Sequence, residues 1–182
     1  DDFYWLFDEV DNKKVDKAHL SLNILRRFSF CDFNLLSKYF VFGFVRNPYL
    51  RVISAFNEGH PKLYKSFKKG ETDITRYKKI LNQFCISLTR DNTQGWDIKY
   101  RHCIQQSNIF YLEGKCYADL IVRLEEFNSV IGKLKLFSPE LAEVAKQWLT
   151  TDNSRNIKKL DVGMEDLLSE ESINNIRHVY ES

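Results

Sequence analysis

The chain has 182 residues, of which 43% are hydrophobic and 14% aromatic, and 27 basic against 25 acidic side chains give a formal net charge of +2. This length favours one domain with a substantial core, and the composition excludes a disordered protein. The nearly balanced charge argues against a protein that binds nucleic acid by bulk charge, so we expect no nucleic-acid partner.

The first half of the chain contains one clear strand–turn–helix unit. The aromatic run Tyr39–Val45 has the length of a strand, and apolar residues then recur at helical spacing up to Asn57. Asn47 suits the N-cap of that helix, and Pro48 suits its first turn. Around this unit we expect a loop over 1–18, a short helix near 20–28, and a basic surface loop over 58–73 that is either solvated or faces an acidic substrate.

The second half alternates helices with a second strand. We expect a strand at ADLIVRL, residues 118–124, and a shorter strand at 109–112. Helices are predicted at 74–88, 125–136, 139–149 and 169–180, the last with Ser169 as N-cap, and loops at 90–100 and 150–159. Strands that alternate with helices predict an α/β fold with a parallel sheet.

The start of the central helix predicts an anion site. Arg46 ends the strand, and Arg51 and Ser54 are neighbours on the helix because they are three residues apart. Together with open N–H groups at the helix start, these side chains predict a site for a phosphate group. The alternative is an ordinary strand–turn–helix unit with a solvated arginine, and spacing alone does not decide between the two.

Cysteine usage and apolar runs bear on the compartment. The four cysteines form no CxxC pair and no Cys/His cluster, so we expect no structural zinc and no required metal. Buried thiols in a reducing compartment are the simplest interpretation, and one disulfide stays open. No stretch approaches the ~20 apolar residues of a membrane span, so we expect no membrane contact from this segment. A bacterial cytoplasm is favoured, or the Golgi lumen if an upstream segment carried an anchor.

The segment Arg46–Phe56, RNPYLRVISAF, resembles the sulfotransferases that use 3′-phosphoadenosine 5′-phosphosulfate (PAPS). It is similar above all to the carbohydrate branch, sulfotransferase family 2, with its bacterial polysaccharide and chondroitin-type enzymes, which carry an R-N/D-P-x-x-R-x-x-S-x-Y/F segment. The resemblance implies that Arg46 and Ser54 hold the 3′-phosphate of the donor, within a motif that also contains Asn47 and Arg51. It further implies a P-loop-NTPase-like fold with a central parallel sheet flanked by helices.

Three further segments resemble the family in the same order, so the resemblance covers most of residues 18–182. AHLSLNIL places His19 27 residues before Arg46. HCIQQ, which starts at His102, resembles an H-W/F-x-P-Q segment with Gln105 in place of proline. YADLIVRLE resembles Y-x-D-F-I-G-R-x-E, with valine in place of glycine.

These matches imply roles for individual side chains. His19 is the first candidate for the base that deprotonates the acceptor and His102 the second, while each is alternatively a structural histidine. Arg123 either contacts the donor or forms a buried ion pair with Glu125. The candidates for binding a carbohydrate or glycan acceptor are Lys99, Arg101 and Gln106.

One family feature is missing, because no lysine-bearing phosphate loop for the 5′-phosphosulfate precedes Tyr39. We therefore expect residues 1–182 to be a single sulfotransferase domain that is incomplete at its N-terminus and lacks the first strand of its sheet. The expected function is sulfuryl transfer from PAPS to a carbohydrate hydroxyl, which leaves adenosine 3′,5′-bisphosphate. The alternatives are a non-catalytic relative that binds 3′-phosphonucleotides, and a nucleotide phosphotransferase, whose GxxxxGKS/T loop is absent. The oligomeric state is not predicted.

Overall fold

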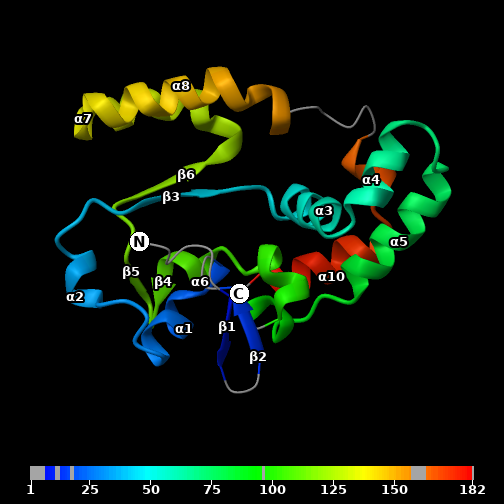
Figure 1. Ribbon diagram of the computed structural model, residues 1–182, viewed down its shortest axis with the longest axis horizontal. Coiled ribbons are helices and arrows are strands. Elements are labelled where there is room, and N and C mark those ends of the chain that lie inside the picture. Colours follow the sequence, from blue (N-terminus) through cyan, green and yellow to red (C-terminus); the bar gives the residue numbers. More distant parts are fainter. Residues whose placement is uncertain (1–6, 11–12, 17–18, 96, 157–162, 182) are drawn as a thin grey trace.

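The computed structural model describes residues 7–10, 13–16, 19–95, 97–156 and 163–181. Two parallel strands, β3 (Phe42–Val45) and β6 (Leu120–Arg123), run side by side across the molecule (Figure 1). Their register pairs Val45 with Arg123, so both strands end at the same edge, where the next helix begins. The predicted α/β class with parallel pairing is confirmed, and among the described residues this sheet has two strands.

Helices and short hairpins surround this pair. On the side of the sheet where β3 ends lie α3 (Pro48–Gly59), α4 (Pro61–Lys68), α5 (Ile74–Ile86), α9 (Met164–Leu167) and α10 (Glu170–Tyr180). A helical hairpin follows β6, formed by α7 (Phe127–Phe137) and α8 (Pro139–Asn156). The remaining elements are β1 (Phe7–Val10), β2 (Lys13–Asp16), α1 (Leu22–Arg27), α2 (Phe33–Leu36), α6 (Ser107–Phe110), β4 (Tyr111–Leu112), β5 (Lys115–Cys116) and the 3₁₀ helices η3 (Asn92–Gln94), η4 (Ile98–Cys103) and η5 (Leu124–Glu126).

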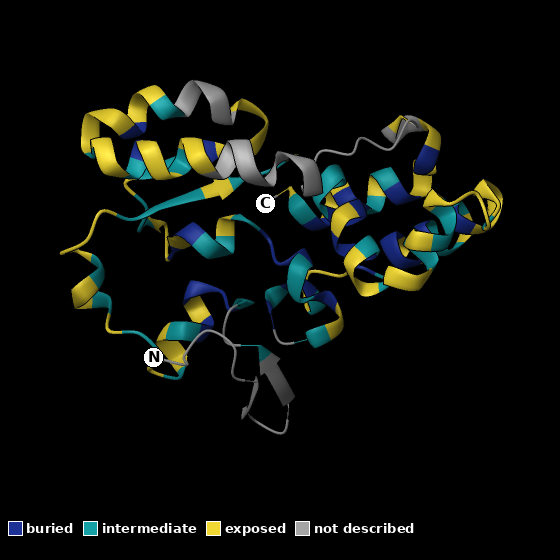
Figure 2. Cartoon of the chain, turned by 45° about the horizontal axis from the view of Figure 1, so that its top comes forward, coloured by how far each residue is buried: buried dark blue, intermediate teal, exposed yellow. Residues whose placement is uncertain are grey.

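The main core lies between α3, α5 and α10 and anchors the helix that follows β3. Phe56 on α3 is fully buried and makes ring contacts with Tyr77 and Phe84 of α5. The hydroxyl of Tyr77 donates a hydrogen bond of 2.6 Å to the side-chain oxygen of Asn57, so this buried polar group is satisfied. Figure 2 shows the buried residues gathered in this group of helices, whereas the described part of α7 and α8 is mostly exposed.

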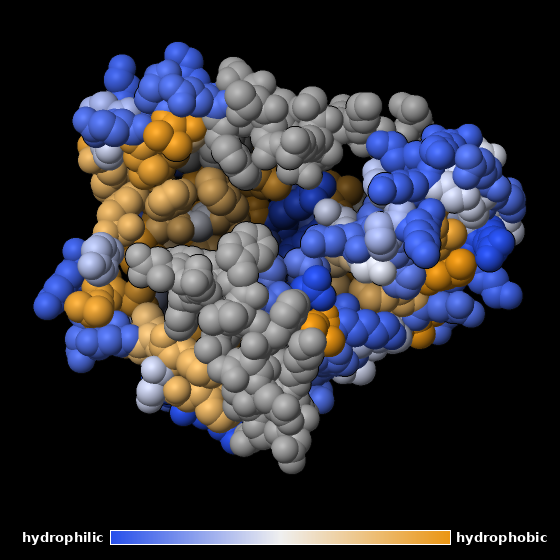
Figure 3. Space-filling model, in the orientation of Figure 1, coloured by the Kyte–Doolittle hydropathy of each residue, from blue (hydrophilic) through white to orange (hydrophobic). Residues whose placement is uncertain are grey.

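A second aromatic group lies at the surface. The Phe40 and Phe137 rings stack with their centroids 4.4 Å apart, and Phe40 also stacks on Phe42. Figure 3 shows apolar surface over the region of β3, β6 and α7. Strand β3 therefore presents aromatic side chains at the surface: Phe42 is half-buried and Phe44 is exposed.

Most predicted elements are confirmed, with bounds that differ by up to three residues. The predicted strands at 39–45 and 118–124 contain β3 and β6, and the helix predicted at 74–88 is α5. The N-cap prediction for Ser169 is also confirmed, since its hydroxyl accepts the N–H of Ser172.

Five loop or strand predictions differ from the structure. The charged segment 58–73 contains the end of α3 and all of α4, because Pro61 starts a new helix whose apolar side chains pack against the core. The polar segment 150–159 continues α8 to Asn156, and its last three residues lie outside the described part. The first residues of the predicted strand 109–112 belong to α6, and segment 90–100 contains 3₁₀ turns. Within 1–18, the described residues form the β1–β2 hairpin.

All four cysteines are free thiols, and Cys85 and Cys103 are buried. Burial raises the pKa of each of these two thiols to about 12, so both stay protonated at neutral pH. No helix in the described part of the chain has the length and hydropathy that a membrane span requires.

We expect Gly43→Ala to lower the free energy of unfolding by about 1–3 kcal/mol, because it overpacks a buried contact. A Cβ at Gly43 would stand 2.3 Å from Cε1 of the buried Phe110 ring. Urea unfolding measures the change. The matched control is Gly132→Ala in α7, where a Cβ meets nothing within 4 Å, and which should leave stability unchanged or raise it by up to about 1 kcal/mol. Equal effects of the two substitutions would contradict this packing.

Candidate active site

The side chain of Asn47 caps the start of α3, in the turn that follows β3. Asn47 Oδ1 accepts the N–H groups of Tyr49 at 3.0 Å and Leu50 at 3.3 Å, and Pro48 occupies the first helical position. The predicted N-cap is therefore confirmed. This cap fixes the direction in which α3 leaves the end of the strand.

Two distant residues bind the main chain of the same turn. Gln106 accepts the N–H of Arg46 at 2.6 Å through Oε1 and donates through Nε2 to the Arg46 carbonyl at 2.7 Å. Glu125, two residues after the end of β6, accepts the N–H of Asn47 at 2.8 Å. Gln106 thus satisfies both main-chain groups of the residue that ends β3.

These contacts correct the expectation that the helix start offers open N–H groups to an anion. The N–H groups of Arg46, Asn47, Tyr49 and Leu50 all have acceptors within the protein. An anion at this end of α3 would therefore be held by side chains and not by the main chain.

Two side chains of the motif are available for that role. The guanidinium of Arg46 is half-buried and makes no hydrogen bond or ion pair with any residue that the structure describes. Ser54 is exposed on α3, and its hydroxyl likewise has no partner in the described part of the chain. A cation and a hydroxyl donor without internal partners suit a phosphate group.

Arg51, the second arginine of the motif, points inward. Its Nε donates to the His102 carbonyl at 3.1 Å, and its Nη1 is buried without a partner among the described residues. Burial lowers the pKa of Arg51. A buried donor without an acceptor costs free energy, which a bound anion would recover. Arg46, Arg51 and Ser54 therefore stay the candidates of this motif for donating to a phosphate.

The two predicted histidines lie in contact. The ring centroids of His19 and His102 are 4.4 Å apart in an edge-to-face arrangement. His19 Nδ1 lies 3.0 Å from Asp16 Oδ2, and Arg101 Nε lies 3.2 Å from the same oxygen. His102 Nε2 lies 3.1 Å from Glu58 Oε1, an ion-pair distance without hydrogen-bond alignment.

The two rings differ in their surroundings. The side chain of His102 is 22% exposed with Nε2 buried, whereas that of His19 is 35% exposed. Burial is the main cause that lowers the pKa of His102. The Glu58 and Asp16 carboxylates oppose this shift, and His19 and Arg101 add to it. His102 is therefore neutral at neutral pH.

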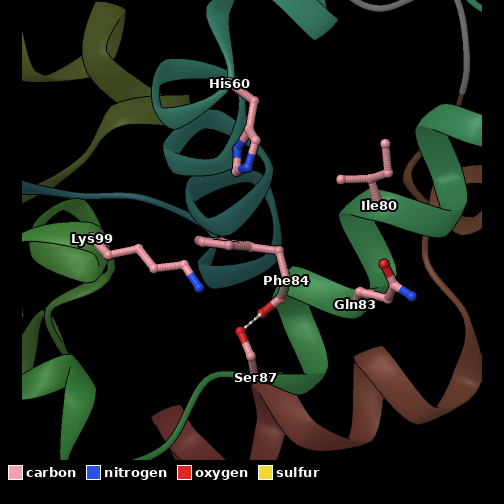
Figure 4. A pocket seen from close by; sticks show the side chains of 6 residues that line it. All are labelled: His60, Ile80, Gln83, Phe84, Ser87 and Lys99. Atoms are coloured by element: carbon pink, nitrogen blue, oxygen red, sulfur yellow. Dashed lines mark hydrogen bonds between the residues drawn. The ribbon is translucent and has the colours of Figure 1, made fainter.

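The predicted acceptor residues have different surroundings. Arg101 is engaged by Asp16 and Gln106 by the Arg46 main chain. Lys99 extends from η4 toward a shallow hollow of ≈ 210 Å³ (Figure 4), and its ammonium lies 4.7 Å from the Tyr100 ring centroid. The other residues that line this hollow are His60, Ile80, Gln83, Phe84 and Ser87.

The expectation of a buried ion pair between Arg123 and Glu125 is wrong. Arg123 is 72% exposed, and its Nη1 lies 3.5 Å from Glu126. Glu125 instead accepts the Asn47 N–H across the ends of the two parallel strands. The alternative role of Arg123, a contact to the donor, stays a prediction.

Sequence reasoning missed Asp16 and Glu58. Asp16 lies three residues before His19, a local signal that could have been used, whereas Glu58 meets His102 only through the tertiary fold. The structure also explains why glutamine occupies position 105. Its N–H donates to the Thr93 carbonyl at 3.2 Å, and its side chain donates to the Val179 carbonyl. A proline at this position would offer neither donor.

Comparison with known proteins agrees with this geometry. The family model described as Sulfotransferase family matches residues 2–181. No curated protein and no protein of solved structure matches the chain significantly. The matched range includes β3, β6, the Arg46–Ser54 motif and both histidines, and a parallel strand pair flanked by helices is what a sulfotransferase fold requires. The chain therefore belongs to the Sulfotransferase family.

Proposed function

We propose that this protein transfers a sulfuryl group from PAPS to a hydroxyl group of a carbohydrate. Family membership supports sulfuryl transfer in general. The identities of the donor and the acceptor are what we propose. The observation that supports it is that two side chains of the motif, Arg46 at the end of β3 and Ser54 on α3, have no hydrogen-bond or ion-pair partner in the described part of the chain.

The donor would be recognised through its 3′-phosphate. Because the main-chain N–H groups of this turn are already bonded, selectivity for a phosphate depends on the charge of Arg46 and the hydroxyl of Ser54. The unsatisfied Nη1 of Arg51 supplies a further donor. Hydrogen bonds from a cation to an anion are the stronger class, so these contacts would dominate the discrimination against a nucleotide without the 3′-phosphate.

Sulfuryl transfer places few covalent demands on the protein. As in phosphoryl transfer, the attacking and leaving oxygens lie in line, and catalysis comes from positioning and electrostatics. The acceptor hydroxyl must lose its proton, and His19 is the more accessible of the two histidines in contact. His102, with Nε2 buried, supports that ring instead of meeting the acceptor.

The acceptor would lie along η4, which carries Lys99 next to the histidine pair. The hollow beside Lys99 combines an ammonium group, an imidazole, an amide and a hydroxyl with the Phe84 ring (Figure 4). Sugar hydroxyls and acidic substituents suit such polar groups, and a pyranose face suits an aromatic ring. We therefore infer a carbohydrate acceptor with acidic substituents.

Arg46→Ala and Ser54→Ala should each weaken binding of adenosine 3′,5′-bisphosphate by about 1–3 kcal/mol, because each removes a hydrogen bond to a charged group. Calorimetric titration measures this, with adenosine 5′-monophosphate as the second ligand. Arg76→Ala, on the exposed face of α5, is the matched control and should bind like the unmodified protein. Equal binding of the two nucleotides by the unmodified protein contradicts the donor assignment and favours a general nucleotide phosphotransferase. Binding with no transfer to any glycan in a screen identifies a non-catalytic relative.

His19→Gln should lower kcat for sulfuryl transfer by about 10²- to 10⁴-fold, the range typical of a lost general base, while binding of adenosine 3′,5′-bisphosphate stays within about 2-fold. The assay follows labelled sulfuryl transfer to the best acceptor of the screen. His178→Gln on α10 replaces an exposed histidine and serves as control. A parallel loss of nucleotide affinity in His19→Gln would move this residue from the acceptor side to the donor site.

A further inference from the structure

The carboxylate of Asp16 is mostly buried and lies against the ring of His19. Asp16 is the last residue of β2, and its side chain is only 13% exposed. Its Oδ2 lies 3.0 Å from His19 Nδ1. An ionised carboxylate can only accept hydrogen bonds, so this contact requires the proton of the neutral imidazole to be on Nδ1.

The opposite nitrogen of His19 is then the basic one. With the proton on Nδ1, Nε2 carries the lone pair, and it has no hydrogen-bond partner among the residues that the structure describes. The side chain is 35% exposed, so this nitrogen can meet a substrate. The hydrogen bond of one ring nitrogen thus decides what the other can do.

Arg101 also holds the Asp16 carboxylate in place. Its Nε lies 3.2 Å from the same Asp16 oxygen, an ion-pair distance without hydrogen-bond alignment, and its Nη1 donates to the Ile98 carbonyl at 2.9 Å. Asp16 is therefore fixed to η4 as well as to its own strand. Gly95 permits a close approach to the His19 main chain. Its φ is +97°, and a Cβ at this position would stand 3.1 Å from the His19 carbonyl oxygen.

Two further titratable groups lie near His19 among the residues that the structure describes. His102 packs edge-to-face on His19, and its low pKa keeps it neutral. Glu58 lies beyond His102, at the Nε2 of that ring. A positive charge that develops on His19 is therefore met by the Asp16 carboxylate and not opposed by a second imidazolium.

We propose that Asp16 is the positioning residue of His19: its carboxylate fixes the tautomer with the proton on Nδ1, so that Nε2 takes the proton of the acceptor hydroxyl. This inference rests on the proposed function. As His19 Nε2 takes the proton, the acceptor oxygen bonds to sulfur, the bond from sulfur to the 5′-phosphate oxygen breaks, and adenosine 3′,5′-bisphosphate leaves. The imidazolium later returns the proton to water.

The first test is spectroscopic and needs no activity. Long-range proton–nitrogen correlation spectra of the ¹⁵N-labelled protein at alkaline pH distinguish protonated from unprotonated ring nitrogens, and His19→Gln assigns the His19 signals. We expect the proton of His19 on Nδ1 in the unmodified protein and on Nε2, or exchanging between the two nitrogens, in Asp16→Asn. A His19 proton on Nε2 in the unmodified protein overturns the proposal.

The second test separates positioning from binding. Asp16→Asn should lower kcat by about 10²- to 10⁴-fold, with the KM of donor and acceptor within about 3-fold. Asp16→Glu keeps the carboxylate and should recover at least 10-fold of that loss, and Glu143→Gln on α8 is the distant carboxylate control. Full activity of Asp16→Asn, or no recovery by Asp16→Glu, refutes the positioning role and leaves the proposed function standing. Failure of the unmodified protein to bind adenosine 3′,5′-bisphosphate would refute the donor, while the tautomer measurement still reports on Asp16.

Discussion

The contact between Gln106 and the main chain of Arg46 organises the candidate site. One amide satisfies both the N–H and the carbonyl at the end of β3, where a strand pair gives way to a helix. The same segment meets α3 twice more, through the carbonyl of His102 at Arg51 and the ring of His102 at Glu58. Because α3 is fixed by the core, these contacts place the histidines along the helix that carries the phosphate motif.

The charges at the start of α3 set a condition on anion binding. The Glu125 carboxylate and the Asn47 side chain occupy the N–H groups that would otherwise attract an anion. A carboxylate at a helix N-terminus stabilises the helix but repels a second anion. Under the proposed function the charge of Arg46 must overcome this repulsion, so we expect this arginine to contribute most to binding of the phosphate.

Local signals in the sequence predicted the local structure well. Asn47-Pro48 predicted the cap of α3, and helical spacing predicted α5 and α10, because caps and periodicity depend on neighbours in the chain. The loop prediction for residues 58–73 failed because its many charges hid a proline that starts a helix. The anion site was predicted from side chains and an open helix start, and only the side chains remain available.

What the sequence could not predict depends on contacts between distant residues. Glu125 reaches Asn47 across 78 positions and Gln106 reaches Arg46 across 60. These partners occupy the main-chain N–H groups that the predicted site would have used, and no sequence pattern near Asn47 indicates them. The contact of the two histidines, 83 positions apart in the sequence, likewise required the fold, although each had been selected separately.

Arg51 joins the two halves of the candidate mechanism. It lies one turn after the cap of α3. Its Nε donates to the His102 carbonyl, and its buried Nη1 has no partner among the described residues. Holding reacting groups on one rigid element lowers the entropy that must be lost in the transition state. The contact of Arg51 with the His102 carbonyl ties α3 to the segment whose imidazole packs against His19. Under the proposed function, a shift of Arg51 toward a bound phosphate would weaken this contact, because the same guanidinium makes both.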